Sequence, residues 1–176
     1  MIVEKYGDIF STSARAIGHG CNAQGKMGSG IARMIKERYP PVYSAYKTAI
    51  VDKSLRLGGI QIVKTSPHYI INLVIQQGFG PPPWKGGRTW AVLHHIESTL
   101  AKLCAQYKTG VITSIALPRL GCGSGGLYWD EEDYTEKSKY WHKVLDRPQR
   151  KWVKDIFYDV FYESPMKVEV WELKTQ

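Results

Sequence analysis

The stretch GHGCNAQGKMGSGIA, residues 18–32, joins a β-type segment to a helix-type segment through a glycine-rich loop. We expect the strand to end near His19 and the helix to begin between Ser29 and Ile31. This order brings backbone N–H groups and a helix N-terminus to one place, where they bind phosphate without side-chain charge. The glycine spacing matches neither GxGxxG nor GxxxxGK[ST], which excludes those two nucleotide loops. The structural alternative is a tight strand-to-helix turn.

A second glycine-rich loop follows a later β-type segment. PRLGCGSGGLYW, residues 118–129, comes directly after SIAL, and four of the six residues from Gly121 to Gly126 are glycine. In an α/β sheet, ligands bind outside the carboxyl ends of the strands. We therefore expect the two loops to face each other across one cleft and to hold a diphosphate. The alternative is that these glycines only permit a sharp turn.

Short apolar, β-branched segments alternate with helix-type segments along the chain. The expected strands are RAIGHG (15–20), GIQIVK (59–64), YIINLVI (69–75), VITSIALPRL (111–120) and KVEVWEL (167–173). Helices with one apolar face are expected over residues 89–107 and 150–163. This alternation predicts a three-layer α/β domain.

Two stretches do not fit a regular element. Residues 78–90, GFGPPPWKGGRTW, are rich in Pro and Gly and are expected to form a long loop. Residues 130–150 are highly charged and are expected to form an exposed helix or insertion. The chain has no internal repeat or low-complexity linker, so we interpret residues 1–176 as a single domain.

The net charge of +8 is distributed unevenly between the two halves of the sequence. Residues 1–88 contain 12 basic and 4 acidic residues, whereas residues 89–176 contain 12 of each. The excess positive charge accompanies the first glycine-rich loop and favours an anionic ligand, although cationic domains are common. A basic stripe with interleaved aromatic residues, typical of polynucleotide binding, is not present.

The cysteine pattern indicates reduced thiols. Cys21, Cys104 and Cys122 are odd in number and widely spaced, which fits neither a disulfide framework nor a CxxC zinc site. No His/Cys/Asp cluster has metal-ligand spacing, so we expect neither a metal nor a cofactor. The sequence shows neither a membrane-length apolar run nor the layout of a secretory signal. We expect a cytoplasmic monomer that has no membrane partner.

The two glycine-rich loops resemble those of the macrodomains, which bind ADP-ribose. The resemblance runs from EKYGDIF (4–10) to KVEVWEL (167–173) and implies a three-layer α/β/α macrodomain with a mixed, largely parallel central sheet. GDIF is similar to the family's first-strand turn, which implies adenine contacts by Asp8 and Ile9. Both loops are similar to one branch of the family. That branch contains terminal ADP-ribose glycohydrolases, DNA ADP-ribosyl glycohydrolase antitoxins and the yeast ADP-ribose 1''-phosphate phosphatase.

The resemblance implies a set of residues around a bound ADP-ribose or ADP-ribose derivative. Asn22 falls where the family has a polar contact to the distal ribose. The other implied ligand-binding residues are Asp8, Ile9, Lys26, Gly28, Ser29, Gly30, Ile31, Phe79, Gly121, Cys122, Gly123, Ser124, Gly125 and Leu127.

The chain departs from the glycohydrolases of this branch at two positions. Their lysine, which attacks or positions the ribose anomeric carbon, is replaced here by Gln76, and glutamine cannot form a Schiff base. Gly125 stands where the terminal glycohydrolase has an aspartate. The resemblance therefore does not support a lysine-dependent glycosidic mechanism.

The similarity to the yeast phosphatase is retained at His19, before CN, and at Phe79, in a Phe-Gly loop. We therefore predict hydrolysis of ADP-ribose 1''-phosphate or a related derivative, with His19 and Asn22 as catalytic residues and His19 as the general base. Alternatively, His19 is a packed, hydrogen-bonded residue. One alternative for the protein is a reader that binds ADP-ribose or ADP-ribosylated macromolecules without turnover. Another is an enzyme that removes ADP-ribose from DNA or protein.

Overall fold

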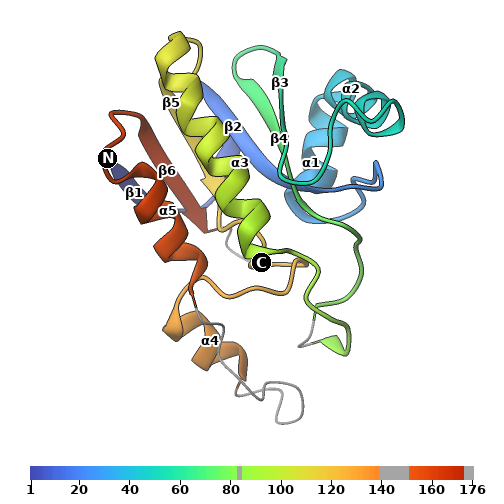
Figure 1. The fold of residues 1–176 in the computed structure, drawn as a ribbon, viewed down its shortest axis with the longest axis vertical. Helices are drawn as coiled ribbons and strands as arrows, with labels where there is room; N and C mark the ends of the chain where they lie inside the picture. Colours follow the sequence, from blue (N-terminus) through green and yellow to red (C-terminus); the bar gives the residue numbers. More distant parts are fainter. Residues whose placement is uncertain (83–84, 139–150, 173–176) are drawn as a thin grey trace.

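A six-stranded sheet forms the centre of the computed structural model, which describes residues 1–82, 85–138 and 151–172 (Figure 1). The strands are β1 (Ile2–Tyr6), β2 (Ala16–Asn22), β3 (Ile60–Lys64), β4 (Tyr69–Gln76), β5 (Ser114–Pro118) and β6 (Lys167–Glu172). Their order is β1-β6-β5-β2-β4-β3. All neighbours are parallel except β3, which pairs antiparallel with β4. The expected mixed, largely parallel sheet is confirmed.

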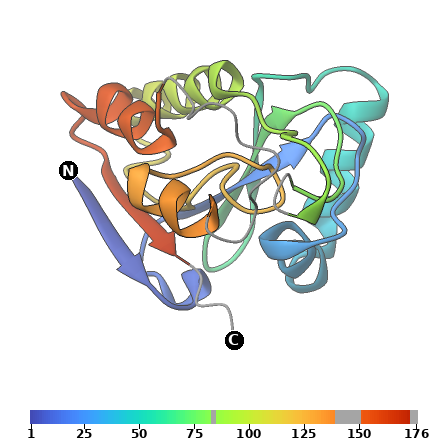
Figure 2. The same cartoon turned by 90° about the horizontal axis from the view of Figure 1, so that it is seen from below.

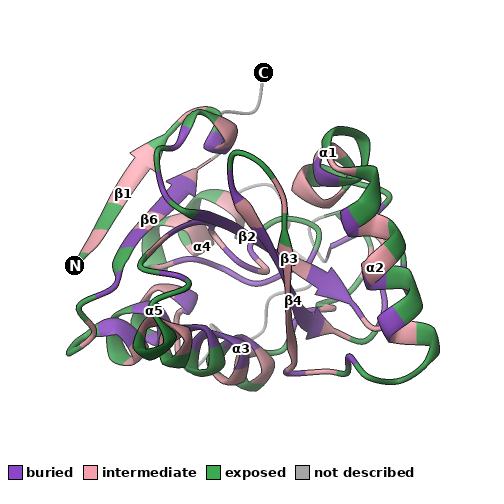
Figure 3. Cartoon of the chain, turned by 90° about the horizontal axis from the view of Figure 1, so that it is seen from above, coloured by how far each residue is buried: buried purple, intermediate pink, exposed green. Residues whose placement is uncertain are grey.

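Helices cover both faces of the sheet. The helices are α1 (Gly30–Arg38), α2 (Pro40–Val51), α3 (Leu93–Ala105), α4 (Glu131–Ser138) and α5 (Val153–Phe161), with short 3-10 helices at Ile9–Ser11 and Gln106–Thr109. α3 and α5 lie on one face, and α1 and α2 lie on the other, with the buried strands between them (Figure 3). The predicted three-layer α/β/α fold is confirmed.

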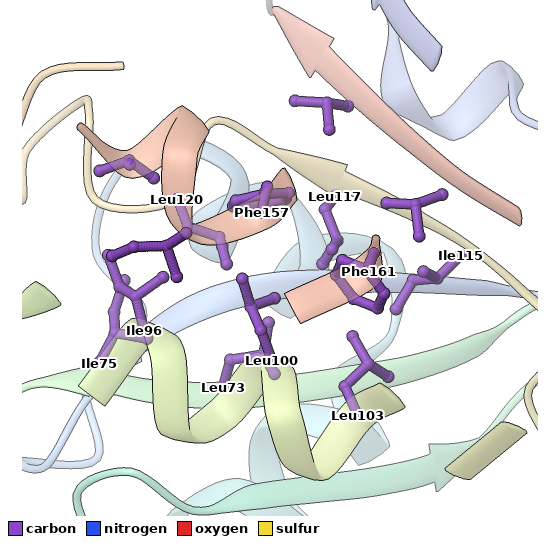
Figure 4. Close-up of a cluster of buried hydrophobic side chains, with 14 of the residues drawn as sticks. Leu73, Ile75, Ile96, Leu100, Leu103, Ile115, Leu117, Leu120, Phe157 and Phe161 are labelled. Carbon is purple, nitrogen blue, oxygen red and sulfur yellow. The ribbon is translucent and has the colours of Figure 1, made fainter. Parts of the chain in front are cut away.

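The largest hydrophobic core lies between the sheet and the helices α3 and α5 (Figure 4). Ile96, Leu100 and Leu103 of α3 are buried there together with Phe157 and Phe161 of α5. These residues belong to the apolar faces that the sequence predicted for the two helices. Burial of this kind stabilises a domain by about 25 cal/mol per Å² of apolar surface removed from water.

The start of α3 differs from the sequence expectation. The predicted helix began at residue 89, whereas α3 begins at Leu93. The backbone N–H groups of Trp90 and Ala91 both donate to the carbonyl of Gly125, at 2.7 and 2.9 Å, and Ala91 forms a β-bridge with Gln76. These long-range hydrogen bonds keep residues 90 and 91 out of the helix, because a helical turn would direct the same N–H groups elsewhere.

The residue pattern did not predict β1 or α2, although the resemblance at GDIF implied a first strand before it. β1 is an edge strand in which Glu4 and Lys5 interrupt the apolar pattern. α2 begins with Pro40, a helix-start signal, since proline lacks the N–H that the first turn leaves unpaired. The charged stretch predicted over 130–150 forms α4 in its first part, and residues 139–150 lie outside the described residues. Among the residues described, no helix is both long and apolar enough to cross a membrane.

Candidate functional site

A cleft of about 830 Å³ opens at the carboxyl ends of β2, β4 and β5. Figure 2 shows this end of the molecule, where the segments that follow the three strands gather. The volume lies within the range of small-molecule sites. The predicted residues that line the cleft are Asn22, Lys26, Gly28, Ser29, Gly30, Ile31, Phe79, Gly121, Gly123, Ser124 and Gly125. Two chain segments far apart in sequence therefore meet across one cleft, as we expected from their glycines.

Five predicted site residues do not belong to the lining of this cleft: Asp8, Ile9, His19, Cys122 and Leu127. The carboxylate of Asp8 accepts from the N–H of Phe10 at 3.0 Å and caps the first 3-10 helix. Ile9 is fully buried in the core. Cys122 and Leu127 belong to the second glycine-rich loop, and both are buried. Adenine contacts by Asp8 and Ile9 stay a prediction.

Asn22 organises the first glycine-rich loop from within. Its side-chain oxygen accepts from the N–H groups of Gln24 and Lys26 at 3.0 and 3.2 Å, and its side-chain nitrogen donates to the Lys26 carbonyl at 2.7 Å. The hydroxyl of Tyr46 on α2 donates to the Asn22 carbonyl. The amide of Asn22 is thus engaged with its own loop on both sides, and a catalytic role for Asn22 stays a prediction.

The N-terminus of α1 faces the cleft without a side-chain cap. Ser29 stands at the N-cap position but makes no capping hydrogen bond, and Gly30, with φ +55°, begins the helix. Gly28, Ser29 and Gly30 are exposed and line the cleft. The first turn of a helix leaves several N–H groups unpaired and carries a partial positive charge. This edge of the cleft therefore suits an anion.

The second glycine-rich loop presents further N–H donors. Its turn is closed by hydrogen bonds from Gly126 to the Gly123 carbonyl and from Leu127 to the Gly121 carbonyl, at 3.1 and 2.9 Å. Within the described residues, the N–H groups of Gly123, Ser124 and Gly125 have no protein acceptor. Consecutive free N–H groups form a concave anion-binding surface.

The charged side chains of the cleft have one sign. Lys26, Lys36, Lys85 and Arg119 line it, and the described lining contains no aspartate or glutamate. Arg119 is paired with carboxylates outside the lining, those of Glu4 and Glu172 at 3.4 and 3.1 Å. Lys36 and Arg119 were not among the predicted site residues. Only the basic character of the first 88 residues pointed toward Lys36, and Arg119 was visible as a residue of the second loop, two positions before its first glycine.

His19 lies in the core, outside the cleft lining. Its side chain is fully buried, and Nε2 lies 2.7 Å from Oδ1 of Asn72 on β4. The Asn72 side-chain nitrogen donates to Gln61 at 2.9 Å, so Oδ1 is the acceptor and His19 Nε2 carries the proton. Burial lowers the pKa of His19 to about 4. A general base has to reach the water that it activates, so this position favours the structural role for His19.

The stability of the protein is expected to depend on His19 between pH 7 and pH 5. The folded-state pKa lies below the unfolded value of about 6.5, so the unfolded state binds the proton first and stability falls as the pH falls. The cost is about 2 kcal/mol at pH 5 relative to pH 7. Urea unfolding across this range should show this loss in the wild type and a smaller one in His19→Gln. Equal pH dependence in the two proteins would contradict the assignment.

The two buried cysteines and Gln76 provide neither a reactive nucleophile nor a general base. Burial raises the pKa of the Cys21 and Cys122 thiols, which disfavours reactive thiolates. Gln76 lines the cleft, and its side-chain nitrogen donates to the Gly78 carbonyl at 2.7 Å. In the part of the chain that the structure describes, no three His, Cys, Asp or Glu side chains are grouped as metal ligands.

A six-stranded mixed sheet whose glycine loops meet at the strand ends is the macrodomain architecture. The family model of the Macro domain matches residues 19–133, and the chain belongs to this family. The resemblance predicted from the two loops is confirmed.

The chain is similar in sequence to two curated relatives and in structure to one solved macrodomain. It is 33% identical over 135 residues to the DNA ADP-ribosyl glycohydrolase of Mycobacterium tuberculosis, which covers 74% of this chain and 36% of the relative. The chain thus spans about a third of that relative's length. It is 25% identical over 165 residues to the ADP-ribose 1''-phosphate phosphatase of Meyerozyma guilliermondii, covering 79% and 92% of the two chains. The macrodomain of Mycobacterium tuberculosis DarG superposes with a TM-score of 0.75 at 26% identity, covering 99% of each chain. Both curated relatives are hydrolases.

Proposed function

We propose that this macrodomain binds ADP-ribose in the cleft and hydrolyses ADP-ribose 1''-phosphate. One observation carries the proposal: two loops with unpaired N–H groups face each other across a cleft whose described charged side chains are all basic. Such a lining suits a diphosphate with a further phosphate on the distal ribose. The names of the two curated relatives support ADP-ribosyl compounds as the class of ligand.

The chemistry of the lining favours phosphate release over cleavage of a glycosidic bond. Most glycosidases use two carboxylates, and a covalent route needs a nucleophile. The described lining holds no carboxylate, and Gln76 supplies no nucleophile. Hydrolysis of a phosphomonoester needs mainly positioning and stabilisation of charge on the phosphoryl oxygens. Lys26 on the first loop and Lys85 on the 78–90 loop are the groups that we assign to this stabilisation.

The proposal is tested by binding and turnover in the same preparation. Titration calorimetry should show saturable binding of ADP-ribose, and ADP-ribose 1''-phosphate should release inorganic phosphate. Lys26→Met and Lys85→Met are each expected to slow release at least ~10-fold, because each removes a charge-assisted contact to the phosphoryl group. His19→Gln is the matched control and should retain turnover, because its side chain lies outside the cleft. Turnover lost in His19→Gln with binding retained would restore the histidine to a catalytic role.

A reader without turnover is the second candidate function. The described lining contains no carboxylate or histidine that would activate water, and this observation favours it. Clean binding of both ligands without phosphate release would establish this function in place of hydrolysis. The same assay with ADP-ribosylated DNA tests the activity named for the mycobacterial relative. Release of free ADP-ribose from the DNA would replace the phosphatase proposal with the glycohydrolase one.

A further inference from the structure

Lys137 on α4 holds the second glycine-rich loop from the side opposite the cleft. Its ammonium donates to the carbonyl oxygen of Cys122 at 2.8 Å. The carboxylate of Asp133, one helical turn earlier, holds the same ammonium at 2.8 Å. Asp133 also accepts from the N–H of Trp129 at 2.9 Å, so one carboxylate ties α4 to the end of the loop and orients the lysine.

The geometry of the peptide unit determines where the Gly123 N–H points once Lys137 holds the Cys122 carbonyl. In a trans peptide unit the C=O and N–H groups point in opposite directions. The single cis bond recorded for the described chain is Ser66–Pro67, so the peptide unit between Cys122 and Gly123 is trans. Because Lys137 takes the Cys122 carbonyl on one side, the Gly123 N–H points to the other. Gly123 lines the cleft and Cys122 does not, so the cleft lies on the Gly123 side of this peptide unit.

The next peptide unit follows the same pattern. The Gly123 carbonyl accepts from the N–H of Gly126 at 3.1 Å, inside the turn. The Ser124 N–H, in the same peptide unit, therefore points away from the turn, and Ser124 also lines the cleft. The direction of the Gly123 and Ser124 N–H groups is thus set by the hydrogen bonds that hold the carbonyls of the same two peptide units. A cation on one of these carbonyls also polarises its peptide, which strengthens the N–H as a donor.

We propose that Lys137 is a positioning residue for the diphosphate: by binding the Cys122 carbonyl, it fixes the Gly123 N–H toward the cleft. This inference rests on the proposed function for the identity of the anion and adds to it a residue outside the lining. Lys137 does not touch the ligand. It acts through the orientation of the loop, so α4 and its charged sequence become part of the binding machinery.

The test compares Lys137→Met with two matched variants. Lys154→Met removes another lysine behind the loop, whose side chain pairs with Glu4 and Asp130 and, among the described residues, donates to no loop carbonyl. Lys137→Arg keeps a cationic donor within reach of Cys122. Each protein is titrated with ADP-ribose, with inorganic pyrophosphate and with adenosine, which carries no phosphate. The Gly123 amide resonance is followed by NMR in each titration.

We expect Lys137→Met to bind ADP-ribose and pyrophosphate about tenfold more weakly and to bind adenosine like the wild type. Its Gly123 amide should also resonate differently before any ligand is added. Lys137→Arg should recover most of the loss, and Lys154→Met should match the wild type. A purely structural role would lower adenosine and ADP-ribose affinity together, and that result overturns the inference. Unchanged pyrophosphate affinity in Lys137→Met overturns it as well.

The two proposals fail in different ways. If wild-type protein binds pyrophosphate with a shift of the Gly123 amide but does not bind ADP-ribose, the proposed function is wrong. In that case the pyrophosphate affinity of Lys137→Met alone tests the positioning role: a weaker affinity than that of the wild type supports the role, and an equal affinity contradicts it.

Discussion

ADP-ribose binding is expected to be lost when Gly123 is replaced by glutamate. The new carboxylate would stand among N–H groups that we assign to the diphosphate, and like charges in contact cost several kcal/mol. The affinity should therefore fall at least ~100-fold. The fold should survive, since no described atom beyond the adjoining residues lies within 4 Å of a Cβ built on Gly123 and its backbone lies outside the left-handed region.

Gly123→Ala is the matched control for this experiment, because it adds the Cβ without the charge. Both variants should unfold at the temperature of the wild type, and calorimetric titration with ADP-ribose should separate them. Undiminished ADP-ribose binding in Gly123→Glu would show that the second glycine-rich loop does not contact the diphosphate.

Gly125→Ala, only two residues further along the loop, should lower the stability of the protein, whereas Gly123→Ala should not. A Cβ on Gly125 would lie 2.6 Å from the Gly121 carbonyl oxygen and 2.9 Å from the Ala91 side chain. The loop would have to open, which also disturbs the hydrogen bonds from Trp90 and Ala91 to the Gly125 carbonyl. We expect a loss of about 3 kcal/mol in the free energy of unfolding, at the upper end for overpacking.

Urea unfolding measures the effect of Gly125→Ala, with Gly123→Ala as the reference of equal chemistry. Equal stabilities for the two variants would show that the loop yields without cost. The terminal glycohydrolase that the chain resembles has an aspartate at the position of Gly125. Because of the same close contacts, this loop could not accommodate an aspartate there without a shift of the backbone. Gly125→Asp combined with Gln76→Lys is therefore not expected to create glycosidic activity.

The two glycine-rich loops were predictable because their signal is local. Glycine clusters directly after β-type segments locate the strand ends, and parallel strands bring their carboxyl ends to one edge of a sheet. The side chains around the loops were harder to predict from the sequence, since their placement depends on residues far away along the chain. Lys137 is the clearest case: its partner, the Cys122 carbonyl, carries no side-chain signal at all.

The position of His19 shows a different limit of sequence analysis. β2 is buried on both faces, so alternation does not reveal which of its side chains face the ligand. Core side chains of the neighbouring strands β4 and β5 crowd against Gly18 and Gly20 on the face that α3 and α5 cover, which leaves His19 on the opposite face beside Asn72. Long-range hydrogen bonds likewise set the start of α3, and the edge strand β1 was missed because its charged residues pair with distant side chains such as Glu169.

The engagement of the Asn22 amide with its own loop has a thermodynamic consequence. The conformational entropy of residues 22–26 is lost when the chain folds, not when a ligand arrives, so binding does not have to order them. Affinity and folding are thereby linked: a ligand gains its donors only from molecules in which the loop has already closed on Asn22. Conditions that loosen the packing of Tyr46 against this loop will weaken binding before they unfold the protein.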